Sequence, residues 1–209
     1  MLRQLSRFLV TGARRQALES LPDSLKVANL RRGMPFAADS ADVVYHSHFL
    51  EHLDPDAART FVAEVKRVLK PGGVHRIVVP DMADLCARYL AHVQACEADP
   101  AEIPRHDAYI GEIIEQMVRR EASGTARQKP LRRRIENLLL GDARRRGETH
   151  QWMYDAHNLR ALLAGVGYRE IASAAYDRSN IPGWDGYGLD RDAAGGEYKP
   201  GSLYMEAVR

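Results

Sequence analysis

The sequence contains very little cysteine. Cys86 and Cys96 are the only two cysteines in the 209 residues, and no C-x-x-C pair occurs. Two thiols cannot form the network of disulfides that holds small secreted domains together. A reducing compartment therefore suits this chain, and we predict a cytoplasmic location.

Long apolar runs and a strong excess of one charge are also absent. No apolar run approaches the roughly 18 to 20 residues that span a bilayer, and the formal net charge is only +2. So small a charge gives no reason to expect a nucleic-acid partner. With 45% hydrophobic and 28% charged residues, the composition is that of one globular domain with its own core.

The N-terminal segment has no acidic residue among its first 18 positions and carries arginine at four of them. A helix there would place Leu2, Leu5 and Leu9 on one stripe. We predict a basic helix at residues 1–24 that packs on the domain or frays at its surface. The alternative is a peripheral membrane contact through residues 1–20.

The remaining residues, 25–209, alternate between strand and helix patterns. The predicted strands are residues 27–30, 43–46, 77–79, 170–176 and 202–208. The predicted helices between them are residues 55–69, 82–93 and 156–166, the last two preceded by Asp81 and Asp155 as caps. This alternation is typical of βαβ units with a mostly parallel sheet, so the predicted fold class is α/β.

Residues 100–148 interrupt that alternation. Two helical patterns, at residues 105–121 and 130–140, flank the loop sequence "ASGTARQKP". We predict that residues 100–148 form a helical insertion on the sheet.

The sequence "HFLEH", from His48 to His52, matches the H-x-x-E-H pattern of some zinc proteases. On a helix, its two histidines would share one face, with Glu51 as a base. A catalytic zinc also needs a third ligand and an open water position, and no other histidine has the spacing of a ligand pair. We therefore predict no zinc and no metal ligands. For His52 the alternative is a helix-end histidine bonded to a backbone carbonyl.

Three ordered blocks between Pro35 and Pro80 carry a family resemblance: "MPFAADSADVVYHSHFLEHL", "FVAEVKRVLKPGG" and "VHRIVVPD". They resemble class I S-adenosylmethionine-dependent methyltransferases, especially the type 11 group. The blocks "HQWMYDAHNLRALLAGVGY" and "SNIPGW…KPGSLYMEAVR" are similar to a bacterial subgroup often met near surface-polysaccharide genes. The resemblance implies S-adenosyl-L-methionine as cofactor and a small molecule or glycan as methyl acceptor. It also implies that the Glu-His stretch holds no zinc.

The chain departs from that family at its glycine-rich loop. Relatives hold the methionine end of the cofactor on such a loop, where glycine lets backbone N–H groups approach. Upstream of Pro35 this chain has only Gly12 and Gly33. We therefore predict a truncated Rossmann-like sheet of order 3-4-5-7-6 in family numbering, in which residues 27–30 are strand three and the last strand is antiparallel.

The missing loop leaves two functional hypotheses open. Losing two or three hydrogen bonds to the cofactor would cost on the order of 3–6 kcal/mol, which is about a hundred- to ten-thousandfold in affinity. One hypothesis is an S-adenosylmethionine-dependent methyltransferase. The other is a catalytically degenerate methyltransferase fold that serves as a partner or scaffold subunit of a homo- or hetero-oligomer, or a truncated gene product.

Ligands of open α/β sheets lie beyond the carboxyl ends of the strands. There, the resemblance implies that His46 and Ser47 line the sulfur end of the cofactor, and it places Asn29 near the adenine. A capping, packing or turn role is the alternative for each. For a hydroxyl acceptor we predict His48 or His150 as the catalytic base, because a histidine titrates near neutral pH.

Three further residues are predicted to contact the acceptor. Asp81 follows a strand, and Trp152 and Tyr154 could form an aromatic wall for a sugar. The alternatives are a helix N-cap for Asp81 and a core position for Trp152.

Overall fold

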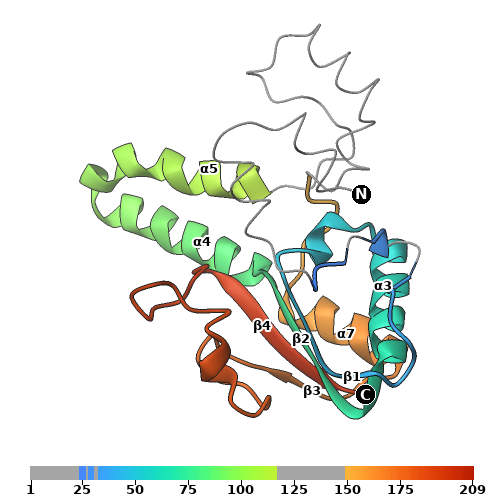
Figure 1. Ribbon diagram of the computed structural model, residues 1–209. Coiled ribbons are helices and arrows are strands. Elements are labelled where there is room, and N and C mark those ends of the chain that lie inside the picture. Colours follow the sequence, from blue (N-terminus) through green and yellow to red (C-terminus); the bar gives the residue numbers. More distant parts are fainter. Residues whose placement is uncertain (1–23, 27, 31–32, 117–148) are drawn as a thin grey trace, which may run out of the picture. The chain divides into compact units, whose positions relative to one another are not determined.

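The computed structural model describes residues 24–26, 28–30, 33–116 and 149–209. The chain divides into two units, Met1–Pro35 and Phe36–Arg209, and every strand and helix named below belongs to the second. That unit is an α/β fold built on a four-stranded mixed sheet (Figure 1). Its strands are β1 (Ala41–Ser47), β2 (Leu69–Pro80), β3 (Arg169–Ser173) and β4 (Ser202–Val208).

The strands lie in the order β1-β2-β4-β3, with β1 parallel to β2 and with β4 antiparallel to both of its neighbours. This confirms the predicted order for four of its five strands. The prediction of a strand at residues 27–30 is wrong for the residues described, because Ala28, Asn29 and Leu30 belong to no strand. Ala28 and Asn29 are exposed, and so short a run gains too little burial to hold an extended conformation. Within the described sheet, β1 is therefore an edge strand.

Helix α3 (Pro55–Val68) begins and ends as the local sequence predicts. The carboxylate of Asp54 accepts a hydrogen bond from the backbone N–H of Ala57 at 3.0 Å and so caps the helix. The buried stripe consists of Ala58, Phe61, Val62, Val65 and Val68. Strand β2 follows α3 without a linker. Near the start of β2 only glycine fits at Gly73, because a Cβ there would lie 2.9 Å from the carbonyl oxygen of Lys70.

Helix α7 (Ala156–Val166) lies beside α3, and the two contact each other at one side of the sheet (Figure 1). Asp155 caps α7, accepting hydrogen bonds from the backbone N–H groups of His157 and Asn158. Gly167 ends it with a φ of +87°, a conformation that glycine adopts without strain.

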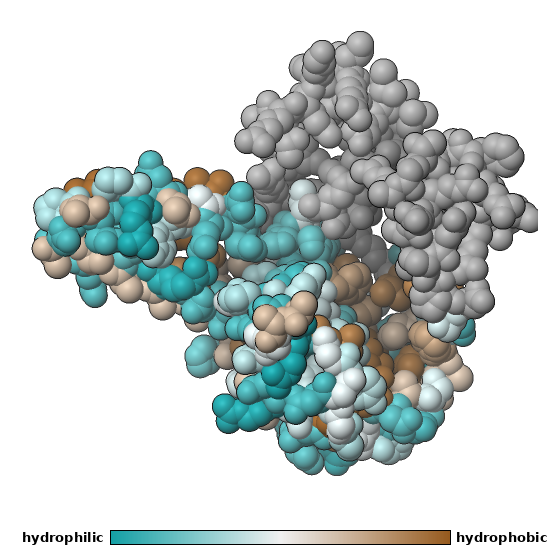
Figure 2. All heavy atoms as spheres, turned by 60° about the vertical axis from the view of Figure 1, so that its left-hand side comes forward, coloured by the Kyte–Doolittle hydropathy of each residue, from teal (hydrophilic) through white to brown (hydrophobic). Residues whose placement is uncertain are grey.

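Helices α4 (Met82–Ala98) and α5 (His106–Gln116) form a hairpin around η3 (Pro100–Arg105), so the helices predicted at residues 82–93 and 105–121 are present as far as the described residues extend. In α4 only Leu85 and His92 are buried, and α5 buries no residue. Leu90 is 59% exposed. On the face shown in Figure 2, small groups of hydrophobic residues lie among hydrophilic ones. Residues 117–148 of the predicted insertion lie outside the described residues, as do residues 1–23 of the predicted basic helix.

No helix among the described residues is long and apolar enough to cross a membrane. The predicted membrane-surface contact through residues 1–20 falls outside the described part of the chain.

A chain of hydrogen bonds crosses the core between the sheet and α3. The Tyr168 hydroxyl donates to the carbonyl oxygen of Val62 at 3.3 Å, so it accepts from His75 Nδ1 at 3.1 Å. His75 Nε2 then has a free lone pair, which accepts from His46 Nε2 at 3.0 Å. Both imidazoles are neutral, because burial lowers the pKa of His46 to about 3 and, with His46 beside it, lowers the pKa of His75 well below its usual value.

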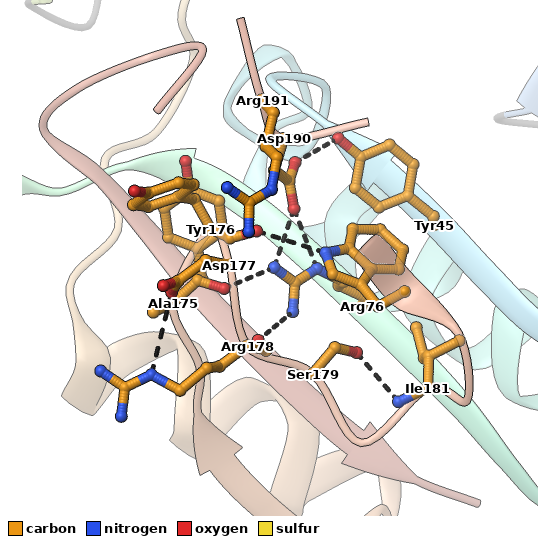
Figure 3. A network of polar contacts seen from close by, with 12 residues as sticks. Tyr45, Arg76, Ala175, Tyr176, Asp177, Arg178, Ser179, Ile181, Asp190 and Arg191 are labelled. Carbon is orange, nitrogen blue, oxygen red and sulfur yellow. Dashed lines mark hydrogen bonds and ion pairs between the residues drawn. The ribbon is translucent and has the colours of Figure 1, made fainter. Parts of the chain in front are cut away.

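The opposite side of β2 presents Arg76, whose side chain is fully buried (Figure 3). Its guanidinium donates to the carboxylates of Asp190, at 2.8 and 3.0 Å, and Glu206, at 2.7 Å. Tyr45 donates to the other oxygen of Asp190 at 2.6 Å, and the ring of Trp184, in η4 (Trp184–Tyr187), lies 4.2 Å from the guanidinium carbon. These contacts fasten the loop between β3 and β4 to the sheet.

The hydrogen-bonded pair of His46 and His75 predicts acid sensitivity. Each folded-state pKa lies below the unfolded value of about 6.5, so the stability that the neutral histidines contribute is complete above that pH and is lost as the pH falls towards about 3. We expect His46→Gln, which keeps a donor for His75, to reduce the slope of unfolding free energy between pH 6 and 4.5 by about 1.4 kcal/mol per pH unit. Urea unfolding measures the slope. The matched control is His157→Gln, at an exposed position, and equal slopes for the two variants would contradict the assignment.

Candidate functional site

The candidate site lies at the carboxyl ends of β1 and β2, where His48 follows one strand and Asp81 follows the other. A cavity of about 230 Å³ opens there between the sheet and the α4–α5 hairpin. Its polar lining includes His48, Asp81, Arg88, Glu112, Glu115 and Ser202. Parallel strands end at the same edge of a sheet, and this edge is where α/β folds place their ligands.

His48 turns the chain sharply off β1. Its φ of +49° is unusual for a residue other than glycine and costs on the order of 1–3 kcal/mol unless the surroundings hold it. The backbone N–H of His48 donates to the carbonyl oxygen of Val78 at 2.9 Å, and its Nε2 lies 3.0 Å from Ser202 Oγ at the start of β4. The turn therefore directs the imidazole across the strand ends and into the lining of the cavity.

Glu51, in the short helix η2 (Leu50–His52), is fully buried, and neither of its carboxylate oxygens has a hydrogen-bond partner. Burial raises the pKa of Glu51 to about 7. The oxygen Oε1 lies 3.4 Å from His48 Nδ1 and 4.0 Å from His52 Nε2. Burial, and then the positive charges of Lys199 and the neighbouring histidines, lower the pKa of His48 to about 4. At neutral pH the carboxyl group is therefore the one that titrates.

The segment from His150 to Tyr154 crosses the same strand ends. The backbone N–H groups of Gln151 and Trp152 donate to the carbonyl oxygen of Glu51 at 2.7 and 3.2 Å. The Met82 N–H donates to the Tyr154 carbonyl at 2.9 Å. These backbone bonds bring the His150 ring to 4.9 Å from the His52 ring.

Two of the predicted site residues, His48 and Asp81, line the cavity. Tyr154 forms a backbone bridge with Asp81, and His150 lies against His52. Asp81 lines the cavity and also caps α4, because its Oδ1 accepts from the Ala83 N–H at 2.9 Å. Tyr154 is buried, and burial together with nearby Glu51 raises the pKa of its hydroxyl. Trp152 is 44% exposed, so it is not the core residue that the alternative describes.

The other predicted site residues lie elsewhere. The imidazole of His46 belongs to the hydrogen-bond chain under α3 and packs against Phe61, with 5.3 Å between ring centroids. Ser47 is half-buried at the end of β1, and exposed Asn29 belongs to the unit Met1–Pro35. The cofactor roles that the resemblance implies for these three residues stay predictions.

Sequence reasoning missed two residues of the site. Glu51 was considered only as a zinc-protease base, and its burial depends on the segment that later covers it. Ser202 lies 154 positions after His48, and only the sheet order β1-β2-β4 brings the two together. No local sequence signal marks that contact.

The H-x-x-E-H pattern does not form the helical face that it predicts in zinc proteases. Helix η2 covers only Leu50–His52, and His48 precedes it in a left-handed conformation. Ligand atoms of Glu51, His52 and His150 do lie within 4.8 Å of one another. The 4.0 Å between His52 Nε2 and Glu51 Oε1 exceeds the roughly 3.3 Å that separates two ligands of tetrahedral zinc. The absence of zinc at this motif stays a prediction.

A larger cavity, of about 620 Å³, lies between the end of β3 and the loop that follows it. None of the predicted site residues lines it. Its buried carboxylate, Glu206, is already bound by Arg76 and by the backbone N–H of Asn180. The smaller cavity is therefore the stronger candidate, because unpartnered titratable groups lie beside it.

Comparison with known families gives one partial match. A family model for a methyltransferase domain of the type 11 group matches residues 6–77, which is less than half of the chain. The match includes residues 6–34, most of which lie outside the described residues. No protein of curated function matches the sequence.

Solved structures give only distant likenesses. An S-adenosylmethionine-dependent methyltransferase from Archaeoglobus fulgidus is 15% identical with a TM-score of 0.42, over 88% of this chain and 66% of its own. One from Mesorhizobium loti is 17% identical with a TM-score of 0.41, over 94% of this chain and 74% of its own.

A third likeness is to a complex between the Haloferax volcanii Trm112 methyltransferase activator and its proposed methyltransferase. It is 14% identical with a TM-score of 0.43, over 93% of this chain and 66% of the other. The chain thus spans just under two thirds of the length of two of these structures. All three scores are below 0.5, so these likenesses carry no inference about activity.

The described residues do not form a complete site for S-adenosyl-L-methionine. None of the four described strands is followed by a glycine-rich loop that leads into a helix. The cavity of about 230 Å³ is also smaller than the roughly 300–1,000 Å³ of pockets for drug-sized ligands.

The raised pKa of Glu51 predicts a pH-dependent cost in stability. The folded-state pKa of about 7 lies above the unfolded value of about 4.3, so the folded protein loses stability as the pH rises between these values. We expect the neutral Glu51→Gln to gain about 2–3 kcal/mol relative to wild type between pH 5 and pH 8, measured by urea unfolding. Glu97→Gln, at an exposed position, is the control. A pH-independent difference for Glu51→Gln would show that Glu51 titrates normally.

Proposed function

We propose that this chain is a methyltransferase-type domain related to S-adenosylmethionine-dependent enzymes, and that its described part binds the methyl acceptor. The acceptor is a hydroxylated small molecule or a glycan. The observation that carries the proposal is the contact of His48 with the buried carboxylate of Glu51 beside the polar cavity. The partial match to a methyltransferase family model supports it.

A hydroxyl acceptor needs a base, because an alcohol is a poor nucleophile until its proton leaves. His48 has the position for this role, since its Nε2 lies at the cavity wall beside Ser202. Its lowered pKa, about 4, makes an isolated imidazole a weak base. An ionised Glu51 opposite Nδ1 offsets that weakness, because its charge stabilises the imidazolium that forms when Nε2 takes the proton.

The proton on His48 depends on the state of Glu51. The Ser202 hydroxyl donates to the Lys199 carbonyl at 2.7 Å, so it accepts from His48 Nε2 when that nitrogen carries the proton. His48 Nδ1 then faces Glu51 with a lone pair, which requires a protonated carboxyl group. When Glu51 ionises, the proton belongs on Nδ1, and the Nε2 lone pair becomes available to an acceptor.

This coupling predicts that His48 changes tautomer near pH 7. We expect nitrogen NMR of the labelled protein to show the Nε2–H form of His48 at pH 5.5 and the Nδ1–H form at pH 8.5, with a midpoint near the Glu51 pKa of about 7. Glu51→Gln removes the titrating group and should hold one tautomer throughout, while Glu97→Gln should behave as wild type. A single tautomer of wild-type His48 across this range would contradict the proposed base.

The affinity for the cofactor distinguishes an active methyltransferase from a catalytically degenerate domain of the same fold. Without a glycine-rich loop, the loss of about 3–6 kcal/mol predicts a dissociation constant weaker than about 100 μM for S-adenosylhomocysteine. Calorimetric titration of the full chain measures it. Low-micromolar binding would mean that residues outside the described part supply the cradle and that the chain is a complete enzyme.

Weak binding favours the alternative, a catalytically degenerate methyltransferase fold that acts as a partner or scaffold subunit. The specific observation in its favour is the absence of a glycine-rich loop anywhere upstream of Pro35. In that case the His48–Glu51 pair would bind the acceptor, and a second subunit would bind the cofactor.

A further inference from the structure

A second cluster of metal-binding side chains lies in the α4–α5 hairpin, away from the groups of the proposed function. His92 and Cys96 occupy α4 four residues apart, so they share one face of the helix. His106 is the first residue of α5. His92 Nδ1 lies 3.0 Å from His106 Nδ1 and 3.5 Å from Cys96 Sγ. The three ligand atoms all lie within 4.8 Å of one another.

These separations are close to those of a tetrahedral zinc site. With zinc–nitrogen bonds of about 2.0–2.1 Å and zinc–sulfur bonds of about 2.3 Å, neighbouring nitrogens lie about 3.3 Å apart, and a nitrogen and a sulfur lie about 3.6 Å apart. Without a metal, two facing Nδ1 atoms can form a hydrogen bond only if one of them carries the proton. A cation would accept both lone pairs and a thiolate at once.

The far side of His92 has the arrangement expected around a metal ligand. His92 is 6% exposed, and its Nε2 is buried without a hydrogen-bond partner. That nitrogen lies 3.6 Å from Glu102 Oε2, and the same oxygen accepts from Arg105 at 2.8 Å. Histidines that bind metal through one ring nitrogen usually present the other N–H to a carboxylate, which fixes the tautomer. Binding through Nδ1 would give His92 this tautomer.

Ring contacts of Tyr89 and His92 with His106 and Tyr109 join the two helices of the hairpin, but few buried side chains support them. Helix α5 buries none of its residues, and α4 buries only Leu85 and His92. The ion pair between Arg88 and Glu112 joins the two helices, but these side chains are 41% and 51% exposed. Exposed pairs contribute roughly 0–1 kcal/mol. A metal ion bound by ligands from both helices would stabilise the contact between α4 and α5.

We propose that His92, Cys96 and His106 bind one Zn²⁺ ion that joins α4 to α5. Both histidines bind through Nδ1, and Cys96 binds as a thiolate after its thiol releases a proton to solvent. A water molecule completes the tetrahedron. No local pattern in the sequence marks these three residues as metal ligands, because His106 joins the other two only through the hairpin.

Zinc titration of the untagged full chain, stripped with a chelator, tests the site. We expect calorimetry to show one Zn²⁺ bound per chain. Cys96→Ser and His106→Gln should each weaken binding by more than about 100-fold, a larger loss than the 10- to 100-fold typical of outer-shell changes. Cys86→Ser is the matched control, because Cys86 lies on the same helix outside the cluster, and it should bind zinc as wild type does.

Three further measurements locate the metal. Glu102→Gln should weaken zinc binding by about 10- to 100-fold without abolishing it. The Co²⁺-substituted protein should show a thiolate-to-cobalt absorption band that Cys86→Ser keeps and Cys96→Ser loses. His150→Gln removes the other candidate ligand set and should leave the stoichiometry at one.

Three results would overturn the proposal. They are failure of the wild-type chain to bind zinc, unchanged affinity in both Cys96→Ser and His106→Gln, and loss of zinc in His150→Gln. Circular dichroism verifies that each variant is folded. If one ligand variant does not fold, the other ligand variant and the cobalt spectrum of the wild-type chain decide.

Discussion

The buried charge of Arg76 is the constraint on which the arrangement of the sheet and its covering loop depends. A guanidinium without solvent must be paired, and leaving it unpaired would cost about 3–5 kcal/mol. Its partners are Glu206 in β4 and Asp190 in the loop that leads to β4. Asp190 also binds Tyr45 of β1, so one cation fixes strands that are distant in the sequence. This loop ends at Ser202, the first residue of β4, whose hydroxyl lies 3.0 Å from His48 Nε2 at the cavity.

Polar side chains on both sides of β2 are hydrogen-bonded in the interior of the protein. On one side Arg76 is surrounded by acceptors, and on the other His75 is hydrogen-bonded through both of its ring nitrogens. Hydrogen-bonded networks of this kind favour one arrangement of the core over its alternatives. Glu51 is different, because it is equally buried and has no hydrogen-bond partner for its carboxylate. An unsatisfied buried carboxyl group next to a cavity is a feature that functional sites often have.

Local sequence predicted the helices and the strand order well, for reasons that act within a few residues. Asp54, Asp81 and Asp155 each cap the helix that follows, since an aspartate side chain can reach the free N–H groups of the first turn. Longer-range features were predicted poorly. In α4, for example, Leu85 is buried but Leu90 is exposed, because periodicity shows which residues share a face but not whether another element covers it. Residues 28–30 form no strand for lack of burial.

The sequence by itself determined the α/β class, the caps and four strands in their order, and it predicted His48 and Asp81 at the strand ends where the candidate cavity lies. These features follow from short-range hydrogen bonding, from hydrophobic periodicity and from the rule that parallel strands end at one edge. Only the tertiary structure decided that Glu51 is buried beside His48, that Ser202 reaches the same imidazole, and that His106 meets His92 and Cys96. Burial and convergence depend on segments far apart in the chain, and no local pattern encodes the dielectric environment or the distances that they create.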